Sequence, residues 1–240
     1  MANFLKMSAN YFCKTCPQKN CVIKLCSEDD MQEVSDKKET SIYRKGQVIF
    51  SEGSTVFGIY IIHNGKVKVY NTGFNLKQQI LRFSVDGDLL GHRGFGAKKY
   101  SIGAIAIEDS VICFIDNPLY YRIIKRNTEM LFHIMAFYAS ELRAAEARMK
   151  NLSQMSVREK VAESLQIMSA IFGKKEKERI VLDTPLTRQE MAEIGGMRPE
   201  QFIKELNIFI ADKVVGFSDK NIIINKPHVL TELLSIYNQQ

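Results

Sequence analysis

Four of the five cysteines in the chain lie close together near its N-terminus. Cys13, Cys16, Cys21 and Cys26 fall within fourteen residues, and Cys113 stands alone much later. Where thiols are kept reduced, grouped cysteines more often bind metal or carry out redox chemistry than form a disulfide framework. Thiolates are the usual ligands of iron–sulfur clusters and of tetrahedral zinc sites. The spacing therefore predicts a soft-metal site or a thiol redox switch.

Simpler interpretations of the same cysteines stay open. Cys113 lies between Ile112 and Phe114, and free cysteine is among the most buried residue types, so it could be a core thiol. The four N-terminal cysteines could hold zinc by themselves. They could also form a thiol switch without metal, or have no function at all.

Other chemistry has little support in the sequence. No Gly-rich phosphate loop, nucleophile elbow or paired-carboxylate motif is present, so we expect no enzymatic activity. A haem site would draw its ligand from His63, His92 or His133, none of which lies in a specific motif. No apolar segment approaches the length of a signal sequence or a membrane span, so we expect a cytoplasmic protein with no membrane partner.

The net charge of +6 and pI near 9.0 are compatible with nucleic-acid binding, but the charge is unevenly distributed. Residues 151–240 hold 12 Lys and Arg against 12 Asp and Glu, whereas residues 1–150 hold 21 against 15. Overall basicity is therefore not evidence that the C-terminal half binds DNA.

Three sequence patterns predict the secondary structure around these residues. The first is a β-rich N-terminal half. Ten of the fourteen glycines lie between Gly46 and Gly103 and separate short apolar runs. Strands of four to six residues between such turns are typical of a small antiparallel sandwich or barrel. We expect an antiparallel roll with strands at residues 47–50, 59–62, 66–70, 79–83, 104–107 and 111–115.

The second pattern is an apolar stripe that continues for three heptads. Its residues recur at steps of four and three with no Gly or Pro between them, and polar side chains occupy the other faces. A stripe this narrow is typical of a two-helix coiled-coil seam, although a helix packed on the roll is the alternative. We expect a homodimer whose seam contains Leu131, Met135, Tyr138, Leu142, Ala145, Met149 and Leu152.

The third pattern indicates a winged helix-turn-helix. A helix is expected at residues 157–172, followed by an exposed turn at 173–179 and a short strand at 180–182. Thr187 and Glu190 form a capping-box pattern, Gly195-Gly196 ends that helix, and Pro199 suits the first turn of the next helix. Two strands at 214–217 and 222–224 then predict a hairpin.

With these parts in this order, the chain resembles the CRP/FNR superfamily of bacterial transcription regulators over nearly its whole length. The roll contains the similar stretch Gly87-Asp88-Leu89-Leu90-Gly91, and the segment 110–115 around Cys113 resembles the site of the fourth cluster ligand in the FNR-like branch. The resemblance implies an α+β protein with three parts. They are a cyclic-nucleotide-binding-like β-roll with its Cys-rich segment (1–126), a dimerisation helix (127–156) and a DNA-binding winged helix-turn-helix (157–240).

The FNR-like branch also implies a cofactor. Cys13, Cys16, Cys21 and Cys113 would hold a [4Fe–4S] cluster that senses oxygen, nitric oxide or redox state. The family's third spacing is one residue longer, so Cys26 is a rival for Cys21. Zinc is the alternative cofactor. An electron-transfer iron–sulfur protein is the alternative function, but an electron carrier needs neither a heptad helix nor a winged helix.

The sequence departs from the family pattern at two places. One concerns the small-molecule ligand and the other concerns the DNA target. Members that bind cyclic AMP have Gly-Glu and Arg-Ser where this chain has Gly91-His92 and Tyr100-Ser101, so we expect no cyclic-AMP response. The recognition helix also differs, and it has Glu205 where an apolar residue is usual.

The resemblance implies double-stranded DNA as the partner, together with RNA polymerase if the protein is an activator. Carried over by position, the residues that would face bases are Glu200, Ile203 and Lys204, and those near phosphates are Arg198 and Gln201.

Overall fold

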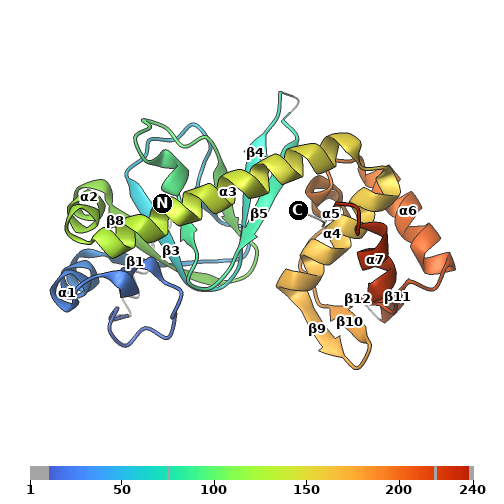
Figure 1. Ribbon diagram of the computed structural model, residues 1–240, viewed down its shortest axis with the longest axis horizontal. Coiled ribbons are helices and arrows are strands. Elements are labelled where there is room, and N and C mark those ends of the chain that lie inside the picture. Colours follow the sequence, from blue (N-terminus) through green and yellow to red (C-terminus); the bar gives the residue numbers. More distant parts are fainter. Residues whose placement is uncertain (1–10, 75, 219–220, 238–240) are drawn as a thin grey trace, which may run out of the picture. The chain divides into compact units, whose positions relative to one another are not determined.

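The computed structural model describes residues 11–74, 76–218 and 221–237. The chain divides into two compact units, residues 1–142 and 143–240, and the long helix α3 (Thr128–Gln154) belongs to both. Each unit contains its own buried apolar residues, and Figure 1 shows the elements of both units.

The first unit is an antiparallel roll of two four-stranded sheets, as expected. One sheet has the order β1-β8-β3-β6 and the other β2-β7-β4-β5. The strands are β1 (Glu39–Tyr43), β2 (Val48–Phe50), β3 (Gly58–Asn64), β4 (Val67–Thr72), β5 (Gln78–Ser84), β6 (Leu89–Leu90), β7 (Gly103–Ala106) and β8 (Ser110–Asp116).

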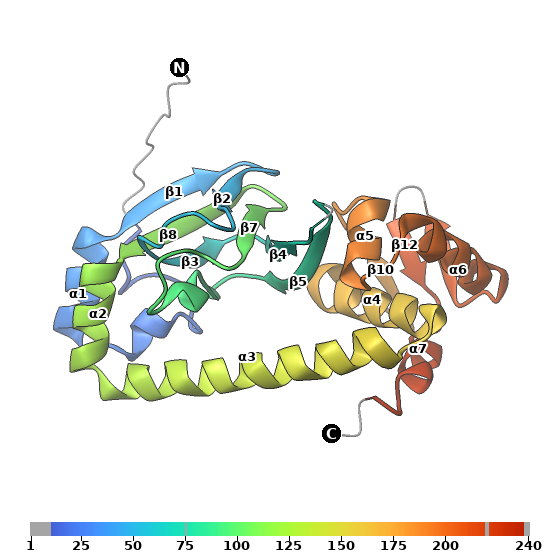
Figure 2. The same ribbon diagram turned by 90° about the horizontal axis from the view of Figure 1, so that it is seen from above.

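Short helices at one end of the roll were not expected from the sequence. They are the 3-10 turn η1 (Val22–Leu25), α1 (Glu28–Lys37) and α2 (Asn117–Arg126), and a further 3-10 turn, η2 (His92–Gly94), follows β6. Both views show α1 and α2 side by side (Figures 1 and 2). α1 is a polar helix that buries only Asp30 and Val34, so its apolar periodicity is weak.

The second unit is a helix-turn-helix with a β-hairpin. Its core is formed by the buried faces of its helices. The residues in this core include Leu165, Phe202 and Phe209. The elements are α4 (Val157–Phe172), β9 (Gly173–Glu176), β10 (Arg179–Leu182), α5 (Arg188–Ile194), α6 (Pro199–Ala211), β11 (Val215–Ser218), β12 (Asn221–Ile224) and α7 (Pro227–Leu233).

One expectation in this unit was wrong. Residues 173–179 are not only an exposed turn, because β9 pairs antiparallel with β10, with Lys174 opposite Val181. All four β9 residues are exposed, so no apolar alternation marked them as a strand. The two β-strands of the hairpin, β11 and β12, form as expected, and the turn at residues 219–220 lies outside the described residues.

The turn between α5 and α6 follows from local chemistry. Thr187 and Glu190 form the expected capping box, with Thr187 N donating to Glu190 Oε2 at 2.8 Å. A Cβ on Gly195 would lie 3.0 Å from Ser164 Oγ and closer still to Met197, and Gly196 has φ +61°. Glycine is therefore required at both positions, for close approach at the first and for backbone conformation at the second.

Within the described residues, no helix is both long and apolar enough to span a membrane.

Candidate functional site

Cys13, Cys16, Cys21 and Cys113 all line a single cavity in the first unit. Cys113 comes from β8, where it lies between Thr40 of β1 and Ile61 of β3 in the sheet register. The other three come from the segment around η1, which Cys21 precedes as N-cap residue. The structure therefore brings together four thiols that are up to 100 residues apart in the sequence.

Backbone contacts hold the cysteine segment in place. Cys16 N donates to Cys13 O at 3.2 Å, which closes a tight turn between these two cysteines. Cys13 N donates to Ser35 Oγ of α1 at 3.0 Å, and Lys24 Nζ donates to Cys13 O at 2.5 Å. The segment is thus tied to α1 by hydrogen bonds as well as by packing.

His63 on β3 joins the same cavity, a feature that the sequence did not indicate. Its Nδ1 lies 3.4 Å from Cys16 Sγ, and its carbonyl accepts a hydrogen bond from Gln18 Nε2 at 2.8 Å. The Tyr11 ring packs on the imidazole with centroids 4.3 Å apart. The other histidines lie elsewhere: His92 is buried and His133 is exposed.

Cys26 does not line the cavity. Its buried thiol lies 3.4 Å from Met130 Sδ of α3. Burial, together with the negative charge of the nearby Asp30, raises the pKa of Cys26 to about 12. The Cys26 thiol is therefore packed against α3 and is not among the residues that line the cavity.

The thiols around the cavity are desolvated. Burial raises the pKa of Cys21 to about 12, and it also raises the pKa of Cys13 and of Cys113. The positive charge of Lys38 acts in the opposite direction on Cys13 and Cys113. A soft metal bound here would have to displace thiol protons.

All five cysteines are free thiols. In the conformation described, no three His, Cys, Asp or Glu side chains among residues 11–74, 76–218 and 221–237 are arranged to hold a metal ion. The four cysteines surround a cavity but do not form a preassembled ligand set. Their donor chemistry nevertheless suits an iron–sulfur cluster, because four cysteines line one cavity.

Aromatic side chains fill the core of the roll around Tyr100. Tyr100 is 3% exposed, its hydroxyl donates to Gly58 O at 2.6 Å, and its ring lies 4.4 Å from that of Phe50. The Phe50 ring in turn stacks on Tyr60 at 5.2 Å. Tyr100, which the sequence resemblance aligns with the expected phosphate-binding cation, therefore lies inside the core.

His92, the other departure in this region, lies in a buried charged cluster with helix α3. Its side chain is fully buried, and its Nε2 lies 3.6 Å from Glu141 Oε2 of α3. Arg82 Nε and Arg93 Nη2 approach the same carboxylate oxygen at 3.3 and 3.0 Å. Burial would raise the pKa of Glu141, but His92, Arg82 and Arg93 together lower it to about 2. This cluster fixes α3 against the roll.

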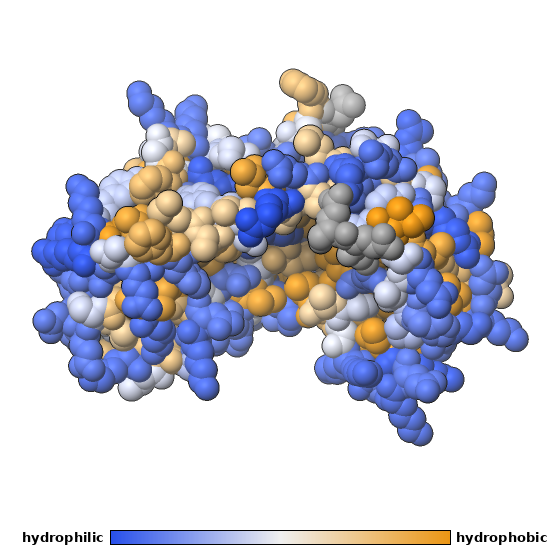
Figure 3. All heavy atoms as spheres, viewed as in Figure 1, coloured by the Kyte–Doolittle hydropathy of each residue, from blue (hydrophilic) through white to orange (hydrophobic). Residues whose placement is uncertain are grey.

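The predicted seam residues of α3 are mostly exposed. Leu142 and Met149 are 61% and 69% exposed, whereas Met130 and Ile134 on another face are buried. Of the predicted set, Leu131, Met135 and Ala145 are also exposed, and Tyr138 and Leu152 are half-buried. Phe132, which is 66% exposed, also contributes to the apolar surface, although it is not one of the predicted seam residues. Apolar atoms gather over the first part of α3 in the space-filling view (Figure 3).

Tyr138 also has a partner within its own chain. Its hydroxyl donates a hydrogen bond to His92 O. Its place in a seam between two chains remains a prediction.

Helix α6, the predicted recognition helix, has one buried and one exposed face. Phe202, Leu206 and Phe209 are buried. All the predicted DNA-contacting residues are exposed, namely Arg198, Glu200, Gln201, Ile203 and Lys204. Gln201 Oε1 also accepts a hydrogen bond from Arg198 N at 3.2 Å, so this side chain caps its own helix.

The unusual Glu205 is explained by an ion pair. Arg158 of α4 lies 3.0 Å from Glu205 Oε1 and 3.0 Å from Asp212 Oδ2. Its guanidinium also lies over the Phe209 ring, 4.5 Å from the centroid. Glu205 therefore attaches α6 to α4 through an ion pair.

Comparison with known proteins agrees with this architecture. Residues 41–127 match the cyclic nucleotide-binding domain family. The regulatory protein HlyX of Actinobacillus pleuropneumoniae is 27% identical over 78% of each chain. The anaerobic regulatory protein of Haemophilus influenzae is 23% identical over 85% of this chain and 79% of its own.

Among solved structures, FixK2 from Bradyrhizobium japonicum has a TM-score of 0.71 at 22% identity, over 82% of this chain and 96% of its own. This likeness covers both units of the fold. With a match to the cyclic nucleotide-binding domain family at residues 41–127, similarity to relatives named as regulatory proteins and a fold like that of FixK2, the chain is similar to regulators of the CRP/FNR type.

Proposed function

We propose that this protein is a dimeric regulator that binds double-stranded DNA in the cytoplasm, and that an iron–sulfur cluster at Cys13, Cys16, Cys21 and Cys113 sets its activity. The proposal rests on the observation that these four cysteines line one cavity. Cys21 is preferred to Cys26 because the Cys26 thiol contacts Met130 outside that cavity.

The donor set fits a cluster better than it fits a zinc site. Zinc held by the N-terminal cysteines would need Cys26 and would leave Cys113 without a role. When bound, a [4Fe–4S] cluster supplies a centre that oxygen or nitric oxide degrades. Three of the proposed ligands lie in the N-terminal segment and the fourth lies in β8, so ligation would join the segment to the roll.

The protein's own residues provide the rest of the mechanism. His63 and Gln18 hold the cysteine segment on β3, and Glu141 holds α3 on the roll. Exposed apolar residues of α3 provide a surface that a second copy of the helix would cover. Dimerisation would set two α6 helices about one DNA turn apart, and a change at the cysteines would act by shifting the dimer equilibrium.

The proposal is tested by purifying the protein without air and measuring its absorption spectrum, iron and sulfide. We expect about four iron and four sulfide per chain, lost on exposure to air. Cys113→Ser should lose most of both, whereas the matched variant Cys26→Ser should retain them. Normal iron and sulfide in Cys113→Ser, or a colourless wild type with tightly bound zinc, would refute the proposed cluster.

A further inference from the structure

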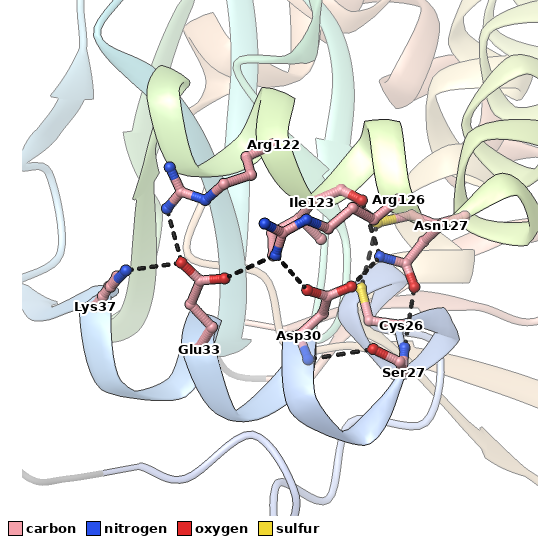
Figure 4. Close-up of polar contacts among 10 residues, drawn as sticks. Cys26, Ser27, Asp30, Glu33, Lys37, Arg122, Ile123, Arg126 and Asn127 are labelled. Carbon is pink, nitrogen blue, oxygen red and sulfur yellow. Dashed lines mark hydrogen bonds and ion pairs between the residues drawn. The ribbon is translucent and has the colours of Figure 1, made fainter.

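A polar network connects the cysteine segment to the beginning of the dimerisation helix, and no part of the proposed site uses it (Figure 4). It joins α1 to the junction between α2 and α3. We call it the α1–α3 clasp, and it consists of Ser27, Asp30, Glu33, Arg122, Arg126 and Asn127.

Asn127 is the centre of the clasp. It is 9% exposed and lies between the last residue of α2 and the first residue of α3. Its Oδ1 accepts a hydrogen bond from Ser27 N at 3.0 Å. Its Nδ2 donates to Asp30 Oδ2 at 2.7 Å and to Ile123 O at 2.8 Å. Every polar atom of this buried amide is therefore used, which fixes its orientation.

The Asp30 carboxylate is the partner that makes the clasp specific. Asp30 is 7% exposed, and its other oxygen accepts from Arg126 Nη1 at 3.3 Å. The hydrogen bond from Asn127 lowers the pKa of Asp30, and Arg126 and Ser27 lower it as well. Asp30 is therefore a buried anion that needs a donor at position 127.

The outer part of the clasp is an exposed ion-pair group. Glu33 accepts from Arg122 at 2.8 Å and from Arg126 at 3.5 Å. Lys37 also pairs with Glu33, at 2.7 Å, from the next turn of α1. Surface pairs of this kind add little stability, so the buried Asp30–Asn127 contact is the part that matters most.

The clasp lies next to the proposed ligands along the chain. Cys21 precedes the single turn η1, Cys26 follows it, and Ser27 caps α1. The thiol of Cys26 itself contacts Met130 in the first turn of α3. A displacement of the cysteine segment would therefore reach Ser27 and Asp30 through one short rigid turn.

We propose that Asp30 and Asn127 are positioning residues that couple the state of the cysteine cavity to the dimerisation helix. This inference rests on the proposed function. While the cysteine segment is held on the roll, Ser27 and Asp30 fix Asn127 and with it the start of α3. Release of the segment loosens the clasp and frees the helix to change its packing.

The test compares the dimer dissociation constant of the protein purified without air with that of the same protein after its iron is removed. Sedimentation provides the constants, and iron and sulfide assays report loading. In the wild type we expect loading to tighten the dimer at least about tenfold. Asn127→Asp sets a second carboxylate against Asp30, so we expect normal iron and sulfide but less than about a threefold effect of loading on the dimer.

Two further variants control this result. Asp30→Asn/Asn127→Asp restores one amide–carboxylate hydrogen bond with the roles exchanged, so the response to loading should return. Lys37→Ala removes a charge from the same helix outside the buried contact and should behave as wild type. If Asn127→Asp does not fold, Asn127→Ala, which adds no charge and leaves Asp30 paired with Arg126, takes its place.

The outcomes separate the two proposals. If the wild type binds no iron, or its dimer does not respond to loading, the proposed function fails and the coupling fails with it. If the wild type responds and the position 127 variant responds equally, the cysteine site stands and the clasp is refuted. Loss of iron from the position 127 variant would also refute the inference, because the clasp would then be part of the ligand site.

Discussion

At the scale of single residues, two replacements separate this chain from the relatives that bind cyclic AMP. Tyr100 lies in the aromatic core of the roll, and His92 lies in a charged cluster under α3. Both residues serve packing within the protein. The packing of Tyr100 and His92 therefore leads us to predict that the domain does not recognise cyclic AMP.

We expect no specific binding of cyclic AMP. The ribose and phosphate would lack an acceptor and a cation, and Tyr100 would have to leave a buried site where its hydroxyl donates to Gly58 O. Titration calorimetry with the full-length protein provides the measurement. Stoichiometric binding with a micromolar dissociation constant would contradict this prediction.

The cluster around Glu141 predicts a loss of stability in acid. The pKa of Glu141 is lowered from 4.5 to about 2, so its stabilising contribution is present above pH 4.5 and is lost as the pH falls toward 2. Burial lowers the pKa of His92 below 6.5, so the neutral ring favours folding and that contribution is lost below pH 6.5. Arg82 and Arg93 face both groups and disfavour a protonated His92.

Thermal unfolding followed by circular dichroism tests the two contributions separately. His92→Gln stays neutral at every pH, so it should flatten the decline in unfolding temperature between pH 7 and 5.

Glu141→Gln should be less stable at neutral pH, by an amount of order 2 kcal/mol, and should lose the decline below pH 4.5. A wild-type protein equally stable at pH 7 and pH 5 would rule out the role of His92.

At the scale of elements, helix α3 has a buried face and an exposed apolar face. Met130 and Ile134 bury one face against the roll, and Leu142 and Met149 leave another exposed. Large apolar side chains that are exposed along one helix are typical of a surface covered by a partner. The proposed partner is the same helix of a second chain.

Leu142→Glu should convert the dimer to a monomer. It would put two carboxylates into an apolar seam, where the cost of removing each charge from water exceeds any new contact. Analytical ultracentrifugation of the protein purified without air provides the measurement. Ser140→Glu, an exposed position about half a helical turn away, adds the same charge as a control and should remain dimeric. An unchanged dimer in Leu142→Glu would exclude this seam.

At the scale of the whole molecule, the charge distribution limits how DNA can be bound. The C-terminal half has no net positive charge, so general attraction to phosphates is weak and the exposed face of α6 must supply the contacts. Lys204 carries the only side-chain positive charge within α6, because Arg198 precedes the helix. Specificity therefore depends on few residues.

Lys204→Ala should weaken binding to a site selected from random duplexes by about tenfold, which corresponds to one lost base contact. Binding is measured by fluorescence anisotropy at several salt concentrations, with the dimer purified without air. Lys213→Ala removes the same charge just beyond α6 and should have a smaller effect. If selection yields no preferred sequence for the loaded dimer, the proposed DNA-binding function is wrong.

The sequence by itself determined the elements whose signals are local. The helix at residues 157–172, the capping box at Thr187 and the glycine turn before α6 all match the structure, because periodicity, caps and backbone conformation depend on neighbouring residues. The alternation of short apolar runs with glycines likewise indicated the roll. The polar helix α1 and the exposed strand β9 lacked such signals and were missed.

Only the tertiary structure decided which distant side chains meet. The pairing of β8 with β1 and β3 brings Cys113 to the cavity with Cys21, while Cys26 packs on α3 instead. Cysteine spacing could not separate Cys21 from Cys26, because strand register and helix packing fix which way each thiol points. The same holds for His63 beside Cys16 and for the clasp at Asn127, since contacts between residues far apart in sequence leave no local pattern.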